Sequence, residues 1–395
     1  WRTYNYALNL KGDAPAQGKM DISVVNIEEN AGQVPVNYVL PPGVTRIIDP
    51  GQSQITQLNE QAMSLKVTDL QSGDARAVYK NSGMDMRTYK RLQMFVHAEK
   101  LIDDKTNLRD GDVSVFLRLG SDSKSNYYEY EVPLSLTEPG NYSTYNAQDQ
   151  EAVCPQSNMF DFPLSLFTDL KLERNAKKRM DNSTVTFQTR YSSYDPDKNQ
   201  NKVTIVGNPS LSDVRTMMIG VRNNSNAAKD IVVWVNEMRL TDFDQSGGWA
   251  AKANVNLGLS DIATLNIAGH VETVGFGGID QSLTERRLDD YYQYNIATMV
   301  ELGRFLPEKV KLKAPLFYSI TEQRTSPKYN PLDQDILLKD ALDNAGSKAE
   351  RDSISDASIE KSTVESFSLS GVSFDIRSKN PMPYDPANFS ISYSY

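Results

Sequence analysis

The stretch IVVWVNEMRLTDFDQSGGWAAKANVNLGLSDIATLNIA, from Ile231 to Ala268, changes its pattern once and decides the expected fold. It opens with the apolar run Ile231–Val235, which is typical of a strand buried on both faces. The chain then leaves this core through Asn236–Leu240, and we expect a turn between Asp242 and the pair Gly247-Gly248. Beyond the two glycines the residue pattern has a different character.

After Trp249 the sequence alternates strictly between apolar residues and small polar ones. The two sets are Val255, Leu257 and Leu259 on one side and Asn254, Asn256 and Gly258 on the other. Strands of soluble proteins usually carry Lys or Glu at the second set of positions. Small polar residues there are typical of a membrane β-strand, with apolar side chains toward lipid and polar ones toward a wet lumen. We therefore expect a soluble β-domain over residues 1–246 and transmembrane β-barrel strands over residues 247–395.

The composition of the 395-residue chain excludes several classes of protein. Hydrophobic residues make up 39% and the mean hydropathy is -0.51, with no apolar run long enough for a membrane helix. A net charge of -9 argues against nucleic acid as a partner. The single cysteine, Cys154, allows neither an internal disulfide nor a cysteine-based metal site. Both ends, Trp1–Tyr4 and Phe389–Tyr395, have strand-like patterns, which suggests a piece of a longer protein.

The first part of the chain predicts a jelly-roll-like β-sandwich. Short strands with a period of two follow one another, separated by Gly/Asp turns, and a clear example is Val113, Val115, Leu117 and Leu119. One helix is expected over Phe162–Lys178, where Leu164, Phe167 and Leu170 have helical spacing. About ten short strands over residues 1–246 suit a jelly roll.

The second part predicts longer strands, of about ten residues, which is the length of a tilted membrane strand. We expect strands over 265–272, 292–302, 310–318 and 366–376, with a bulge at Gly371, and a closing strand at Phe389–Tyr395. A long polar loop near 321–363 contains one expected helix, around Ile336–Asp352. Since the smallest membrane barrels have about eight strands, these strands form only part of a large barrel that is incomplete in this chain.

Several sequence motifs, taken together and in order, resemble those of one known family. They are Pro41-Pro42-Gly43-Val44, Asn59-Glu60-Gln61 with Leu65-Lys66-Val67, Gly73–Lys80, Asp85–Leu92, Met94–Glu99, and Val233–Leu240 running on to Gly247–Ala251. This is the SprA/Sov family of gliding-motility and secretion proteins. The resemblance covers mainly residues 41–100 and 231–260.

The resemblance implies a function and a set of partners. Members of the family form the outer-membrane translocon of the type IX secretion system, which passes folded cargo proteins to the cell surface and is also needed for gliding motility. The implied partners are secreted cargo proteins, a smaller (PorV-like) outer-membrane barrel, a periplasmic plug protein and membrane lipid. The implied location is the outer membrane, with the sandwich domain in the periplasm or at the cell surface.

The sequence offers no convincing catalytic, cofactor or metal residue, so we expect no enzyme. His97 and His270 are the only histidines, and neither has a partner at zinc-ligand spacing. Glu237, Asp242 and Asp244 could supply oxygen ligands to Ca²⁺, although aspartates are also common in turns.

The competing hypothesis is a cell-surface carbohydrate-binding or adhesive β-sandwich module. In that hypothesis residues 250–395 form a second soluble β-domain. Exposed aromatic side chains would bind the sugar, and the candidates are Tyr127, Tyr128, Tyr191 and Tyr194. The alternation alone does not decide between the two hypotheses, because soluble sheets also have one polar face.

Overall fold

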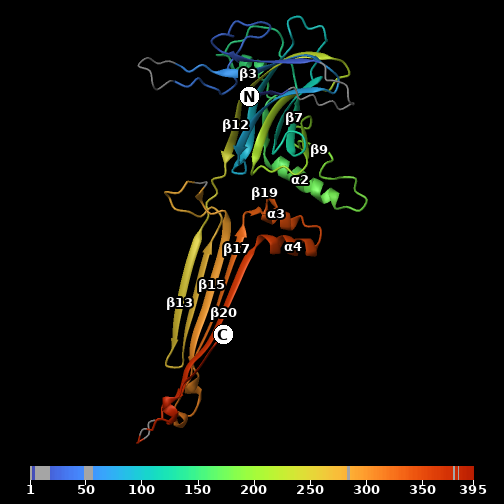
Figure 1. Cartoon of the computed structure of the whole chain (residues 1–395). Helices are drawn as coiled ribbons and strands as arrows, with labels where there is room; N and C mark the ends of the chain where they lie inside the picture. Colours follow the sequence, from blue (N-terminus) through green and yellow to red (C-terminus); the bar gives the residue numbers. More distant parts are fainter. Residues whose placement is uncertain (1, 5–17, 49–56, 283–284, 377–378, 381) are drawn as a thin grey trace. The chain divides into compact units, whose positions relative to one another are not determined.

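The structure is a computed structural model that describes residues 2–4, 18–48, 57–282, 285–376, 379–380 and 382–395. The chain divides into two compact units, Trp1–Asp244 and Gln245–Tyr395 (Figure 1). The sequence analysis placed the division after residue 246. Strands dominate both units, so the all-β class expected from the sequence is confirmed.

The first unit is a sandwich of two antiparallel sheets. The larger sheet has seven strands in the order β1-β4-β11-β6-β7-β10-β9, and the smaller has five in the order β2-β3-β12-β5-β8. The strands of the larger sheet are β1 (Arg2–Tyr4), β4 (Ala75–Met84), β6 (Val113–Gly120), β7 (Tyr127–Pro133), β9 (Tyr191–Tyr194), β10 (Lys202–Val206) and β11 (Val214–Asn223). Those of the smaller sheet are β2 (Lys19–Asn26), β3 (Gln61–Leu70), β5 (Tyr89–Glu99), β8 (Phe160–Pro163) and β12 (Lys229–Phe243).

Alternate residues of both sheets meet in one buried core. Val115 and Leu117 of β6 and Met94 and Val96 of β5 are all members of it. Because successive side chains of a strand point to opposite faces, the period of two in the sequence selects these residues. Packing on the outer face of the larger sheet also restricts the residue type, as Gly220 of β11 shows. A Cβ atom there would lie 2.3 Å from the Phe116 ring, so only glycine leaves room for it.

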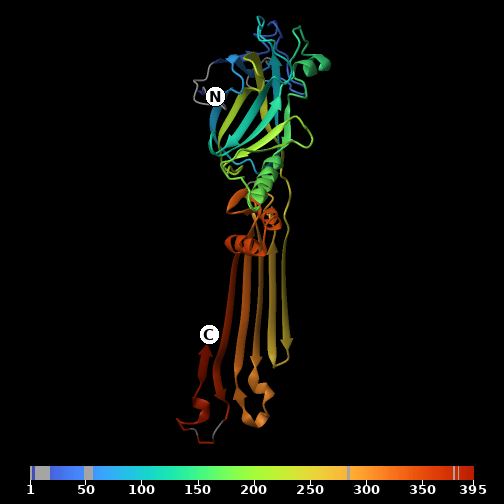
Figure 2. The same ribbon diagram turned by 90° about the vertical axis from the view of Figure 1, so that its right-hand side faces the viewer.

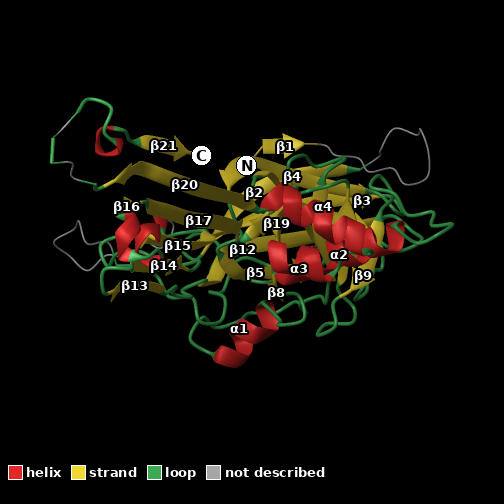
Figure 3. Ribbon diagram, turned by 90° about the horizontal axis from the view of Figure 1, so that it is seen from below, coloured by secondary structure: helices red, strands yellow, loops and turns green. Residues whose placement is uncertain are grey.

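Two helices accompany the sandwich (red in Figure 3). The predicted helix is present as α2 (Ser165–Lys178), and it begins three residues later than expected because Phe160–Pro163 forms β8 and pairs with β5. The other helix, α1 (Ala147–Val153), was not predicted. It is short, and its N-terminus is capped by the Asn146 side chain, which accepts a hydrogen bond from the Gln148 amide.

Strand β12 corrects the expected path of the opening stretch. The residues Asn236–Leu240 do not leave the sheet: the strand continues through them to Phe243, with a register shift between Asn236 and Arg239. Glu237 and Asp242 have positive φ angles of 50° and 55°. These two residues bend a continuing strand, which sequence periodicity alone cannot distinguish from a strand that ends.

The second unit is built on a single antiparallel sheet, whose strands lie side by side in one layer (Figures 1 and 2). The strand order is β13-β14-β15-β17-β20-β16, and β21 also pairs with β20. The bounds are β13 (Ala250–Leu259), β14 (Ala263–Glu272), β15 (Asp289–Glu301), β16 (Leu312–Lys313), β17 (Pro315–Pro327), β20 (Glu360–Phe374) and β21 (Ile391–Ser394). The expected bulge is confirmed, because the register of the β20–β21 pair shifts at Gly371, which has a φ of 65°.

Two expectations for this unit need correction. The strand expected over 310–318 is divided. Val310 ends the 3-10 turn η3 (Glu308–Val310), Leu312–Lys313 form the short strand β16, and β17 begins at Pro315. Another 3-10 turn, η2 (Leu302–Phe305), follows β15. The polar loop expected near 321–363 is shorter, since β17 extends to Pro327 and β20 begins at Glu360.

The segment between β17 and β20 holds more regular structure than the one helix expected around Ile336–Asp352. It contains a hairpin of β18 (Tyr329–Asn330) and β19 (Asp333–Leu337), followed by helices α3 (Leu338–Asp343) and α4 (Lys348–Ser358). The break between the two helices falls at Asn344–Gly346, where residues that favour turns end the helical pattern. A third 3-10 turn, η4 (Pro386–Asn388), precedes β21.

Candidate functional site: a two-faced sheet

The strand register of the second unit gathers apolar side chains on one face of its sheet. Val255 of β13 pairs with Ile267 of β14, Ile267 with Ile296 of β15, and Ile296 with Ile320 of β17. We call this the apolar face. Its apolar members are Val255, Leu257, Leu259, Leu265, Ile267, Val271, Tyr292, Tyr294, Ile296, Val300, Leu316, Tyr318, Ile320, Phe367, Leu369 and Tyr393.

The opposite face carries mostly small, uncharged polar side chains, and we call it the polar face. Asn256 pairs with Asn266, Asn266 with Ala297, Ala297 with Ser319, and Ser319 with Ser366. The alternation noted in the sequence at Val255–Leu259 therefore extends across five strands in register.

No second layer of the described chain covers this sheet. The three buried hydrophobic clusters among the described residues all belong to the first unit. Leu257 and Leu259 on the apolar face are 47% and 56% exposed. A contiguous apolar surface of this kind is unfavourable in water and marks a site of contact with protein or lipid.

The apolar face ends along an oblique line. On β15 the first charged residue beyond the apolar set is Asp290, on β17 it is Glu322, and on β20 it is Glu365. In the register, Glu322 lies opposite Tyr294 and Glu365 opposite Ile320, so the limit moves along the strands from β15 to β20. A planar boundary crosses a sheet obliquely when the strands are tilted to it, as the strands of membrane barrels are by about 35–45°.

Tyrosine marks this limit on β15. The Tyr294 hydroxyl donates to a Glu322 carboxylate oxygen at 3.1 Å, and Lys361 lies 3.1 Å from the other oxygen of Glu322. Tyr292 is the next residue on the same face. Tyr side chains with an apolar ring and a hydrated hydroxyl form the girdles at the edges of membrane barrels.

Several charged side chains of the polar face lie at one end and pair with one another, while Glu301 lies at the other end of β15. His270 Nε2 lies 2.8 Å from Glu272 Oε1, and the other oxygen of Glu272 accepts from Arg287. Arg287 Nε is 3.1 Å from Asp289. The structure thus places His270 beside Glu272, in a network of hydrogen bonds and ion pairs at one end of the polar face.

The other histidine, His97, lies in a buried cluster that the sequence analysis did not detect. The imidazole is 1% exposed, and Nδ1 is 2.7 Å from the Val153 carbonyl oxygen. A carbonyl can only accept, so Nδ1 carries the hydrogen and cannot take a proton from Thr137, whose Oγ1 is 3.1 Å away. The ring also packs on Trp234, with 4.0 Å between centroids. Burial by α1 creates this arrangement, which gives His97 a role in packing.

The possible calcium ligands have other partners in the structure. Glu237 pairs with Arg239, and Asp244 lies 3.9 Å from Lys90. Within the described ranges, no three Asp, Glu, His or Cys side chains are grouped as metal ligands. The strand that continues to Phe243 explains this, because it separates Glu237 from Asp244 along an extended backbone.

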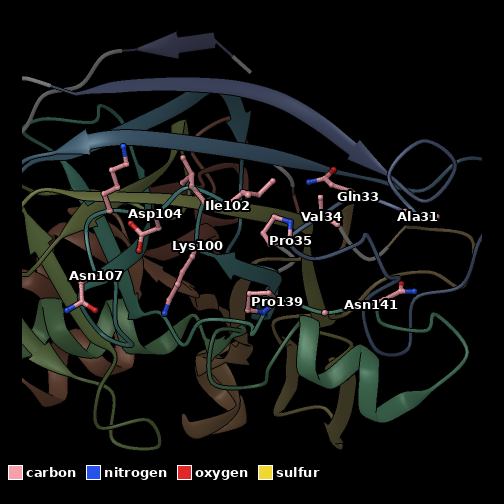
Figure 4. Close-up of a pocket in the computed structure, with 14 residues that line it drawn as sticks. Ala31, Gln33, Val34, Pro35, Lys100, Ile102, Asp104, Asn107, Pro139 and Asn141 are labelled. Atoms are coloured by element: carbon pink, nitrogen blue, oxygen red, sulfur yellow. The ribbon is translucent and has the colours of Figure 1, made fainter.

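Most of the proposed sugar-binding tyrosines are not available as stacking platforms. Tyr128 is fully buried in the core, Tyr127 lies beneath the guanidinium of Arg118 at 4.2 Å, and only Tyr194 is largely exposed. A groove of about 1020 Å³ is present in the first unit, between the segments 31–35, 100–107 and 139–141 (Figure 4). No aromatic side chain is among the residues that line it.

Comparison with known families agrees with the resemblance. A family model described as motility related/secretion protein (SprA_N) matches residues 1–342. The chain belongs to this family. The match to the SprA_N family extends well beyond the motifs at 41–100 and 231–260, and it includes β13, β14, β15 and β17 of the two-faced sheet. No curated protein matches the chain.

Membership of the SprA_N family makes this a motility- or secretion-related protein. In the described part of the chain, no helix is both long enough and apolar enough to cross a membrane.

Proposed function

We propose that the second unit is part of the wall of an outer-membrane protein-conducting channel, the translocon of a type IX secretion system. One observation carries this proposal: a single antiparallel layer exposes apolar side chains on one face and uncharged polar side chains on the other. In a bilayer every backbone N–H and C=O group needs a partner, and paired strands supply one. The apolar face would contact lipid and the polar face would line the lumen.

The channel would pass folded cargo proteins to the cell surface and would support gliding motility. Its mechanism is containment, in which a hydrated wall surrounds the cargo while other domains and partners control opening. No covalent chemistry is required, and we infer that the chain is not an enzyme. The buried position of His97, which is 1% exposed and bonded to the Val153 carbonyl oxygen, supports this, since a general base must reach its substrate.

The proposed partners are secreted cargo, a smaller (PorV-like) outer-membrane barrel, a periplasmic plug protein and membrane lipid. Nucleic acid is not among them, because the net charge is -9. The first unit would fold in water, in the periplasm or at the cell surface. Its buried core and its two-layer architecture support this assignment.

Adjacent residues on β15 give a matched test of the membrane orientation. Ile296 is on the apolar face and Ala297 is on the polar face. An arginine at the bilayer midplane costs about 2–4 kcal/mol, whereas an arginine in a hydrated lumen costs little. We expect Ile296→Arg to reduce the outer-membrane yield of heat-modifiable full-length protein several-fold, and Ala297→Arg to leave it close to wild type.

The outcomes of this test separate the hypotheses. A greater loss with Ala297→Arg would mean that the polar face meets lipid. Equal yields of the two variants, in protein that remains soluble without detergent, would favour the adhesive module and contradict the channel.

A further inference from the structure

The central part of the polar face is free of ionisable side chains on all five long strands. It consists of three register rows, all within the described residues. The rows are Asn254–Ala268–Asn295–Thr321–Val364, Asn256–Asn266–Ala297–Ser319–Ser366 and Gly258–Thr264–Met299–Phe317–Ser368. We call these rows the neutral band. Twelve of its fifteen members are amides, hydroxyls or very small side chains, and the other three are Val364, Met299 and Phe317. The chain as a whole is 24% charged.

Three of the four asparagines of the neutral band pair with neighbours across the strands. Asn266 Nδ2 donates to Asn256 Oδ1 at 2.5 Å, and Asn295 Nδ2 donates to Thr321 Oγ1 at 2.7 Å. A side chain that is already paired within the wall gains little by exchanging that bond for one to a passing molecule, because hydrogen bonds exchanged in water contribute little net free energy. A molecule that passes the neutral band therefore contacts polar groups but is bound only weakly by them.

The charges beyond the band do not reach its centre. Lys252 and Asn256 lie on the same face of β13, four residues apart, which is roughly 13 Å at about 3.3 Å per residue. This exceeds the Debye length of about 8 Å at physiological ionic strength. Glu272, near Lys252, is also paired with Arg287, so the field of its carboxylate is reduced further.

We propose that the neutral band makes this wall indifferent to the net charge of the cargo, so that the substrate class includes both acidic and basic folded proteins. A lumen lined with one sign of charge would hold proteins of the opposite sign, because several weak ion pairs made together retain a partner strongly. A lumen lined with apolar groups would hold any exposed hydrophobic patch. The neutral band avoids retention by charge, and it limits large exposed apolar groups to Val364, Met299 and Phe317. This inference rests on the proposed channel function.

The test places charges within the band of the full-length protein in its own cell. Ala268, Ser319 and Ser368 lie on three different strands, and none of their side chains takes part in the amide pairs described above. The three are changed together to Lys, to Glu, or to Gln as a neutral control for bulk. Export is measured for an acidic and a basic version of one folded reporter, each carrying the same secretion signal, together with the outer-membrane yield of the channel.

We expect wild type and the Gln variant to export both reporters with a ratio within about twofold, since the local attraction at a neutral wall is small. The Lys variant should reduce export of the acidic reporter at least threefold relative to the basic one, and the Glu variant should do the reverse. The single changes Ser319→Lys and Ser319→Glu, read by the same ratio, replace the triple variants if those assemble poorly.

Two results overturn this inference: a strong preference of the wild type for one reporter, or an unchanged ratio in correctly assembled Lys and Glu variants. The proposed function fails in a different way, which is export of both reporters at the normal rate in cells that lack the protein.

Discussion

Strand residues alternate between two faces in both units, but the units differ in which side chains they bury and which they expose. In the first unit the outer face of the larger sheet contains buried charges: Glu129 is fully buried beside Arg118 and Arg222. In the second unit the exposed face is apolar, with Leu259 56% exposed. A soluble domain can bury charges when they are paired, and a membrane wall can expose leucine when lipid covers it. Under the proposed channel function, the medium next to each face, rather than the strand pattern, separates the two units.

The largest effect is expected when the two units are expressed as separate fragments, which tests whether they differ in their need for detergent. Residues 1–244 should give a soluble protein with a cooperative thermal transition in the absence of detergent, because the core is built from both sheets of that unit. Residues 245–395 should aggregate unless detergent covers the apolar face. Solubility and circular dichroism with and without detergent measure both. Detergent-dependent folding of the first fragment, or detergent-free folding of the second, would remove the distinction.

A large effect is also expected from the buried charge cluster of the first unit. The two oxygens of Glu129 contact three arginines, namely Arg118 at 2.5 Å, Arg222 at 3.1 Å, and Arg190. Glu129→Ala should lower the free energy of unfolding by about 3–5 kcal/mol, since it removes the carboxylate that pairs with the buried Arg118 and leaves Arg222, among the described residues, only its pair with Glu131. Denaturant unfolding of the first unit, followed by tryptophan fluorescence, measures the loss.

The matched control is Glu173→Ala on α2. Glu173 bonds Lys177 at 2.9 Å and Tyr191 at 2.7 Å, but its side chain is 47% exposed. Exposed ion pairs contribute about 0–1 kcal/mol, so the control should change stability little. Losses of similar size in the two variants would show that burial does not set the strength of the Glu129 contacts.

The smallest predicted effect depends on pH. Burial alone would raise the pKa of Glu129, but Arg222, Arg118 and Arg190 together lower it to about 2. Because the folded-state pKa lies below the unfolded value of about 4.3, this carboxylate stabilises the first unit above that value. The contribution is lost as the pH falls from about 4.3 through about 2.

Wild type should therefore lose stability more steeply than Glu129→Gln between pH 5 and pH 2, a window set by the pKa values of about 4.3 and about 2. Thermal midpoints recorded across this range for both proteins test the prediction. Parallel curves would mean that Glu129 does not retain its charge in the folded protein.

Much of the two-faced sheet could be predicted from the sequence. The alternation of Val255, Leu257 and Leu259 with Asn254 and Asn256 identified the two sets of residues, and the structure keeps each set on one face. This succeeds because the period of a strand is a local property of the backbone. The strand predicted from Val310 is divided in the structure into the end of η3, the two-residue β16 and β17 from Pro315, because alternation in sequence does not show where a strand is interrupted.

What the sequence by itself determined is the side-chain character of each strand face, and hence the all-β class and the change of character near Gly247. Only the tertiary structure decided which faces are covered. In the sequence Glu129 has the pattern of an ordinary strand residue. Its pairing with Arg118 and Arg222 requires β7, β6 and β11 to lie side by side in the sheet. The oblique limit of the apolar face likewise needs the register of Tyr294 with Glu322 and of Ile320 with Glu365. The physical reason is that alternation acts between neighbours in the chain, whereas burial and cross-strand pairing join residues that are distant in sequence.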